Sequence, residues 1–209
     1  MTKTLSLFLT LFVALNLSAQ NFEGQITYQN SFKSKLPNIS DEQWTLMMGA
    51  IHNYFIKEGN YRTNSNGNLV QWQLYINNDN KLYNKISTSE TVLWNDGAIN
   101  TDEVLKAEVK KDVVEILGYK CDELTLTCKS GEQKYYFSPA LKVETALFEK
   151  HKYGNWAEFI SKAKSLPLKI VVDNAQFTME SLATEVKPAK LDNALFTLPP
   201  GTKTERSPY

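Results

Sequence analysis

Two histidines, His52 and His151, are the side chains whose ordinary pKa best suits general-base catalysis near neutral pH. Catalysis of the Ser-His-Asp type needs a histidine beside a nucleophile and an orienting acid. No Gly-x-Ser-x-Gly nucleophile elbow accompanies either histidine in the sequence, and the two fall on different predicted elements. We therefore expect no catalytic residue and a protein that is not an enzyme.

Metal and phosphate ligands are equally sparse. Cys121, Asp122 and Glu123 are consecutive, but neighbours on a strand point to opposite faces, and no histidine follows at ligand spacing. The Asn66-Gly67 and Asp96-Gly97 pairs indicate turns, because no Gly-Lys-Ser/Thr follows them. We expect no metal and no cofactor.

Apolar and aromatic residues on two predicted helices and two predicted strands could line a ligand-binding cavity. Methionine and aromatic side chains suit adaptable apolar pockets. Stripes at helical spacing are equally typical of an ordinary packed core, and the sequence leaves both interpretations open. The candidate ligand-binding residues are Trp44, Met47, Met48, Trp72, Tyr136, Trp156, Phe159 and Ile160.

The two cysteines, Cys121 and Cys128, lie seven positions apart, just before and at the end of the predicted strand at residues 122–128. At about 3.3 Å per residue their separation along a strand exceeds about 20 Å, whereas a disulfide holds its two Cα atoms about 5.5 Å apart. A bond between them would need a bulge or a turn.

The first residues of the chain predict export. Lys3 is the only charge there, residues 5–17 are mostly apolar, and Ser18 and Ala19 follow. This pattern is typical of a secretory signal peptide, so we expect cleavage after Ala19 and removal of residues 1–19. The apolar run is shorter than the roughly 20 residues of a membrane-spanning helix. The mature protein is expected to be periplasmic or outer-membrane-associated.

The composition of the mature chain excludes two classes of partner. Its basic and acidic side chains nearly balance, at 23 each before Lys3 is removed, so the protein offers no field to attract nucleic acid or an anionic membrane surface. No later segment is apolar enough to form a transmembrane span. The remaining length suits one domain.

Short strands bounded by turn residues are the dominant pattern after the signal peptide. Asn66-Gly67 is a hairpin signal, and Lys111-Asp112 is a predicted turn. The predicted strands cover residues 22–28, 52–57, 61–64, 69–76, 81–86, 91–95, 104–110, 113–117, 122–128, 132–138, 168–173 and 177–187.

Two amphipathic helices interrupt the strands. Ser40 and Gln43 predict a capping box at the start of the first, and Gly49 ends it. The second covers residues 155–164, and a shorter third helix is expected at residues 143–150. Because a helix that is apolar on one side must bury that side, we expect the helices to lie against the sheet.

These elements predict a mainly β (α+β) fold. We expect a strongly curved antiparallel sheet, or incomplete β-barrel, with two or three helices covering its concave face. The single domain spans residues 20–201, and a polar tail follows at residues 202–209.

Four short motifs carry a resemblance to a known family. The motifs are FEGQITY at residues 22–28, ILGYKC at 116–121, LPLK at 166–169 and LFTLPPG at 195–201. In this order they resemble an exported family of unknown function from Gram-negative bacteria, which is similar to the outer-membrane lipoprotein carrier (LolA/LolB-like) superfamily. The resemblance covers nearly the whole mature chain, and it implies an open half-barrel and a cavity for acyl chains.

Two functions remain as hypotheses. The first, favoured by the resemblance, is a binding protein that holds a lipid, acyl chain or other apolar ligand between sheet and helices, which requires an internal apolar cavity of at least about 300 Å³. The alternative is a non-enzymatic envelope interaction protein with a packed core, whose exposed strand edge recruits an envelope protein partner.

Overall fold

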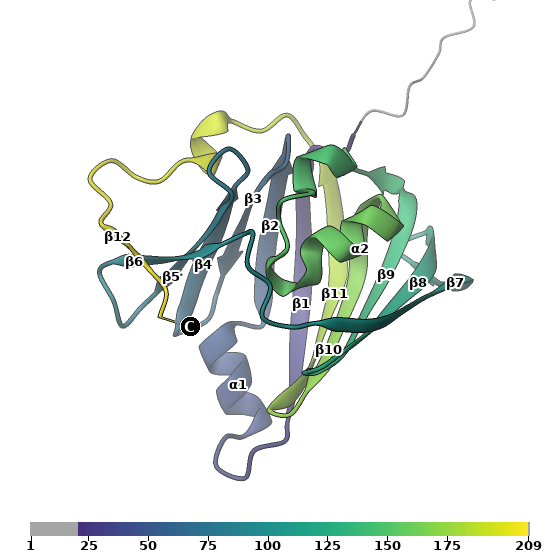
Figure 1. Ribbon diagram of the computed structural model, residues 1–209. Coiled ribbons are helices and arrows are strands. Elements are labelled where there is room, and N and C mark those ends of the chain that lie inside the picture. The colour runs from purple at the N-terminus through teal and green to yellow at the C-terminus, as the bar shows by residue number, and fades with distance from the viewer. Residues whose placement is uncertain (1–20, 209) are drawn as a thin grey trace, which may run out of the picture.

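The computed structural model describes residues 21–208, so the predicted signal peptide, residues 1–19, lies outside the described residues. One twelve-stranded sheet runs through the molecule in the order β12-β6-β5-β4-β3-β2-β1-β11-β10-β9-β8-β7 (Figure 1). The strands are β1 (Gly24–Ser34), β2 (Ile51–Lys57), β3 (Asn60–Ser65), β4 (Val70–Ile76), β5 (Lys81–Ile86), β6 (Val92–Asp96), β7 (Val104–Ile116), β8 (Tyr119–Cys128), β9 (Gly131–Lys142), β10 (Ser165–Asn174), β11 (Phe177–Pro188) and β12 (Thr204–Arg206).

The helical elements are few and short. No helix within residues 21–208 is long and apolar enough to cross a membrane. The elements are the α-helices α1 (Asp41–Met48) and α2 (Trp156–Ala163) and the 3₁₀ turns η1 (Thr145–Phe148), η2 (Tyr153–Asn155) and η3 (Asn193–Phe196).

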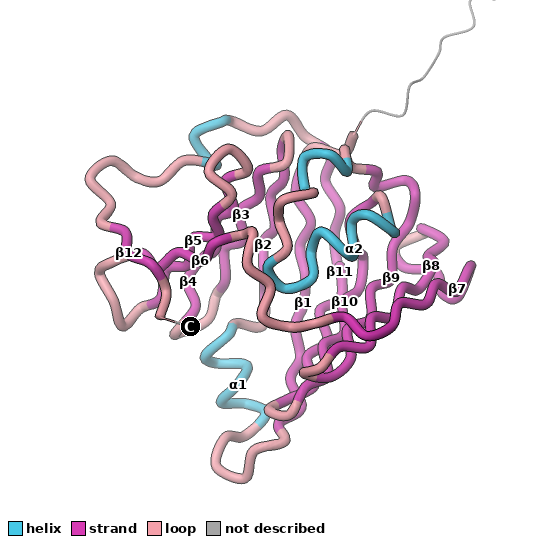
Figure 2. The backbone as a smooth tube through the Cα atoms, viewed as in Figure 1, coloured by secondary structure: helices cyan, strands magenta, loops and turns pink. Residues whose placement is uncertain are grey.

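The predicted fold class is wrong. The fold is mainly β rather than α+β, because strands dominate the described chain and its two α-helices have eight residues each (Figure 2). The sheet is mixed rather than antiparallel, since β12 pairs with β6 in parallel, and it does not close, because β12 and β7 are its edges. Of the two α-helices, α2 lies across the sheet, whereas α1 lies beside the last part of β1 (Figure 1).

The face of the sheet that α2 covers, called the inner face here, carries the main hydrophobic core. Phe159 and Ile160 on α2 are fully buried, and the Phe159 ring stacks on Tyr135 of β9 at 4.2 Å between centroids. Leu124 and Phe137 complete this contact from β8 and β9. Each such buried side chain stabilises the fold by roughly 1.5–3 kcal/mol, so α2 is held mainly by apolar burial.

The opposite, outer face of the sheet is covered over one half by the C-terminal segment. Leu74, Tyr83 and Val92 from β4, β5 and β6 form a second core with Phe196 of η3. The chain then continues into β12. Residues 202–209, expected to form a polar tail after the domain, therefore supply a strand that covers the β6 edge.

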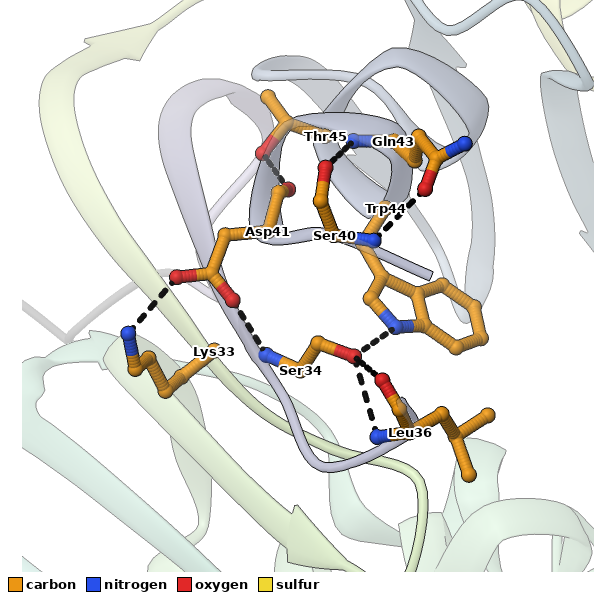
Figure 3. A network of polar contacts seen from close by, with 8 residues as sticks. All are labelled: Lys33, Ser34, Leu36, Ser40, Asp41, Gln43, Trp44 and Thr45. Carbon is orange, nitrogen blue, oxygen red and sulfur yellow. Dashed lines mark hydrogen bonds and ion pairs between the residues drawn. The ribbon is translucent and has the colours of Figure 1, made fainter. Parts of the chain in front are cut away.

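Helix α1 is fixed by a polar network at its N-terminus (Figure 3). The Gln43 backbone N–H donates to Ser40 Oγ at 3.2 Å, and the Gln43 side-chain Oε1 accepts from the Ser40 backbone N–H at 2.7 Å. This confirms the predicted capping box. Asp41 accepts a hydrogen bond from Ser34 N at 2.7 Å and pairs with Lys33. These contacts tie α1 to the end of β1.

Replacing Ser40 with alanine is expected to lower the free energy of unfolding by about 1 kcal/mol, because the first turn of α1 loses its cap. Urea denaturation followed by circular dichroism measures this change. Ser40→Asp is the matched control, since aspartate caps equally well, and it should retain the stability of the unmodified protein. Equal losses in both variants would contradict this account of the cap.

Candidate functional site

The edge of β7 is the longest free strand edge in the described part of the chain. β7 has thirteen residues and pairs with β8 alone, whereas the three-residue β12 covers the opposite edge of the sheet. A free edge presents a row of unpaired backbone N–H and C=O groups that another strand can pair with.

Apolar side chains gather along the same strand. Four of the seven exposed large hydrophobic residues within residues 21–208 lie on β7, and a fifth lies in the turn that follows it. Clustered exposed apolar residues of this kind mark interaction sites, whereas single ones are ordinary. The five residues, called the β7 edge patch here, are Leu105, Val109, Val113, Val114 and Leu117.

Leu117 occupies a costly backbone conformation. It has φ of 51° and precedes Gly118 with φ of 80° in the two-residue turn between β7 and β8. Turns of this type favour asparagine at the first position, and a left-handed conformation costs an ordinary residue roughly 1–2 kcal/mol. An exposed leucine is therefore held where a polar residue would be more stable.

A bulge divides β7 into two parts. Lys110 pairs with Glu123 and Val114 pairs with Cys121, so the residues between are left out of register. Asp112 has φ of 52°, and its backbone N–H donates to Asp122 Oδ1 at 3.0 Å. The predicted turn at Lys111-Asp112 between two strands is thus a bulge within one strand, and the regular edge extends from 106 to 110.

A groove of about 1010 Å³ opens beside the first part of β7. Val104, Leu105 and Ala107 line it from β7, and Ala157 and Ser161 line it from α2. Most of its lining is polar, with charges of both signs. The charged lining residues are Glu103, Lys106, Lys129, Glu149, Lys152 and Glu158.

Hydrogen bonds fix the segment before β7 to the start of α2. The Asn100 Nδ2 group donates to Asn155 Oδ1 at 2.6 Å, and Asn155 is buried with φ of 64°. Asp102 accepts hydrogen bonds from the backbone and hydroxyl of Ser130, at 3.0 and 2.7 Å, in the turn between β8 and β9. The two walls of the groove are therefore joined at one end.

The space beneath α2 is filled by aromatic side chains. Phe159 lies within 4.2 Å of the Tyr135 ring and 5.3 Å of the Trp156 ring, measured between centroids. Tyr61 lies 6.0 Å from Trp156 and stacks on Tyr75 at 5.3 Å. This packing joins the sheet to α2 directly, and the groove lies beside the helix rather than beneath it.

Comparison with known proteins is informative about the fold alone. No family model and no curated protein matches the chain. The structure is similar to an uncharacterized conserved protein from Thermus thermophilus, with 11% identity, 91% of this chain and 94% of that chain covered, and a TM-score of 0.52. It is also similar to PNGF-II, with 16% identity, 89% of this chain but 32% of that chain covered, and a TM-score of 0.49. At these identities the first similarity shows a shared fold, and the second is too weak to support an argument.

The structure brings three of the eight candidate ligand-binding residues together. Trp156, Phe159 and Ile160 share the face of α2 that packs on the sheet. Trp72 is half-buried against the core of the outer face, with the Arg62 guanidinium 4.8 Å above its ring. Tyr136 alternates with the buried Tyr135 on β9, so it also faces away from α2.

The remaining three candidates lie on α1, away from α2. Trp44 packs edge-on against Phe177 and donates its indole N–H to Ser34 Oγ at 3.2 Å. Met47 and Met48 are half-buried, and the Met48 carbonyl accepts a hydrogen bond from Ser65 Oγ at 2.7 Å. These residues anchor α1 to β1 and β3 and do not share a site with α2.

Neither histidine lies in a recognisable catalytic arrangement. His52 Nε2 contacts the Met48 carbonyl at 2.9 Å, and burial lowers the pKa of His52. His151 contacts Tyr61 and is treated below. Among residues 21–208, no group of three or more His, Cys, Asp and Glu residues is placed to hold a metal ion.

The two cysteines, Cys121 and Cys128, are free and buried. Burial raises the pKa of Cys128 to about 11 and raises that of Cys121, which makes both thiols poor nucleophiles at neutral pH. The β7 edge patch was not predicted from the sequence. Its apolar residues are visible there, but nothing in a sequence shows that a strand lacks a second neighbouring strand.

Proposed function

We propose that this protein is a non-enzymatic interaction protein of the cell envelope, and that an extended segment of a different protein binds along the β7 edge. The observation that carries the proposal is the exposure of the β7 edge patch on the longest free strand edge of the described sheet. Strand addition of this kind gains affinity from backbone hydrogen bonds and specificity from pockets for alternate side chains.

The groove supports the same occupant. It adjoins the first part of β7, and α2 provides its far wall. A strand added beside β7 would direct alternate side chains into this groove, where residues of both charges and several apolar residues can receive them. The groove therefore supplies the selectivity that a bare strand edge lacks.

A second copy of this chain is a poor partner for β7. If the regular edge at residues 106–110 paired antiparallel with itself in full overlap, Lys106 would face Lys110 and Glu108 would face its own copy. Like charges directly opposite each other destabilise a strand pair. A different protein avoids this repulsion, so we assign the edge to a heterologous partner.

Photocrosslinking tests this function with a matched pair of sites. Leu105 on β7 and Leu46 on α1 are both 59% exposed, so a photoreactive amino acid at either site meets solvent equally. In the source cells, the probe at 105 should form one discrete adduct with an envelope protein, which the probe at 46 should not form. Adding Val109→Glu to the 105 probe should abolish the adduct. No adduct at 105, or the same adduct from both sites, would refute the proposal.

Lipid binding is the second candidate, and the size of the groove favours it. At about 1010 Å³ the groove could hold an acyl chain, as the resemblance to the lipoprotein carriers implies. Most of its lining residues are polar or charged and it is open to solvent, which ranks this candidate lower, since sites for apolar ligands are lined predominantly by apolar residues. Native mass spectrometry before and after lipid extraction distinguishes the two, because a bound lipid would appear as a mass lost on extraction.

A further inference from the structure

Residues 143–164, called the cap segment here, form a strap across the inner face that contains η1, η2 and α2. Polar side chains from turns of the sheet hold its first half. Asn77 Nδ2 donates to the Leu147 carbonyl, and Asn80 Nδ2 donates to the Lys150 carbonyl at 3.0 Å. The cap segment also forms the α2 wall of the groove.

His151 is the residue that connects this strap to the middle of the sheet. Its ring stacks on Tyr75 of β4 with 3.9 Å between centroids and 11° between planes. Its Nε2 shares a hydrogen bond of 2.8 Å with the Tyr61 hydroxyl on β3. The His151 side chain is 1% exposed, so water does not reach the contact.

The backbone of His151 transmits this contact to α2. Its N–H donates to the Phe148 carbonyl at 3.0 Å, and its carbonyl accepts from the Ala157 N–H at 2.7 Å, in the first turn of α2. A displacement of the His151 ring would therefore disturb the start of the helix. Trp156 is next to that bond, and its ring lies 6.4 Å from the His151 ring, measured between centroids.

The surroundings of His151 accept a neutral ring only. The titratable groups that face it are the hydroxyls of Tyr61 and Tyr75 from β3 and β4, with Tyr54 stacked behind Tyr61. Burial raises the pKa of all three tyrosines, so none supplies a negative charge. The second ring nitrogen, Nδ1, is buried without a hydrogen-bond partner. A protonated ring would leave a positive charge buried with no counter-charge.

We propose that His151 is an acid-sensitive latch, whose protonation releases the cap segment from β3 and β4 and so moves α2 away from the β7 side of the groove. Burial lowers the pKa of His151 to about 3, whereas an exposed histidine titrates near 6.5. Below pH 6.5 the released state therefore binds a proton that the closed state excludes, and acid favours release. The effect on partner binding rests on the function proposed above, but the release itself does not.

Hydrogen exchange measured by NMR tests the latch on the unmodified protein. Between pH 6.5 and 4, protection factors of the α2 amides, corrected for the intrinsic pH dependence of exchange, should fall by up to about tenfold per pH unit. Amides of β1 and β11, which exchange on global unfolding, should stay much better protected than those of α2 at every pH in this range. A pH-independent α2, or α2 amides protected as strongly as those of β1 and β11 throughout, would overturn the proposal.

Two variants and one titration separate the latch from other causes. His151→Phe keeps a flat ring but cannot take a proton, so its α2 protection should not depend on pH. His52→Asn removes the other histidine, beside α1, and should leave the pH dependence intact. If His151→Phe does not fold, the ring resonances of His151 in the unmodified protein decide: titration in the folded state near pH 6.5 would refute the latch.

The latch and the proposed function can fail separately. The exchange experiment needs no partner, so a failed photocrosslinking experiment leaves the latch standing. Conversely, an adduct at 105 combined with pH-independent protection of the α2 amides would support the β7 interface and refute the His151 latch.

Discussion

Phe159→Ala is expected to lower the free energy of unfolding by about 3–5 kcal/mol, the usual cost of truncating a buried phenylalanine. Phe159 has no exposed surface, and its ring contacts Tyr135, Phe137 and Trp156. The sheet strands beneath cannot move to fill the space, because they are paired on both sides. Urea denaturation of the two proteins measures the difference.

Leu46→Ala is the control for this change. Leu46 is a large apolar residue on α1 that is mostly exposed, so its truncation should change stability by less than about 0.5 kcal/mol. A similarly small effect for Phe159→Ala would mean that α2 covers a hollow rather than a packed core. Lipid binding would then be favoured over the proposed interaction function.

The second large effect concerns pH. His151 is neutral in the folded protein because burial lowers its pKa to about 3, and in the unfolded chain it titrates near 6.5. Below pH 6.5 the unfolded chain therefore binds more protons, and the folded state loses stability as the pH falls. This contribution should amount to about 1.4 kcal/mol for each pH unit between 6 and 4.

His151→Phe isolates this contribution from that of the carboxylates. Near neutral pH the variant should be less stable than the unmodified protein, because the Tyr61 hydroxyl loses its 2.8 Å partner. As the pH falls to 4, the variant should overtake the unmodified protein. Parallel stability curves for the two proteins would show that His151 does not carry the predicted pH dependence.

Local elements were predictable where local chemistry determines them. Ser40 and Gln43 form the expected capping box, and the stripe of Trp156, Phe159 and Ile160 does face the core. The positions of most strands also follow from alternation and turn residues. In each case the deciding contacts lie within a few positions in the sequence.

Long-range placement could not be predicted in the same way. Trp44, Met47 and Met48 on α1 have the spacing of a core stripe, yet Trp44 packs at the end of β1 through Ser34 and Phe177. The tail forms β12 because the edge of β6 is free to pair with it. Asp112 adopts its bulge conformation because Asp122, on the neighbouring strand, accepts its backbone N–H.

The candidate site depended on a property that the sequence does not contain. Leu105, Val109 and Val113 have the spacing of an ordinary half-buried strand, so their apolar character predicts a strand without predicting its exposure. Only the strand order shows that β7 is an edge. The candidates Trp72 and Tyr136 lie away from α2 for a related reason, since period-two alternation does not say which face of a sheet α2 will cover.

Amide hydrogen exchange along β7 tests the central claim most directly. The measurement compares the free protein with its complex with the partner identified by the probe at 105. Strand addition predicts that alternate amides at residues 106–110 exchange more slowly in the complex, while those of α1 are unchanged. A complex in which the β7 amides exchange as fast as in the free protein would contradict binding at this edge.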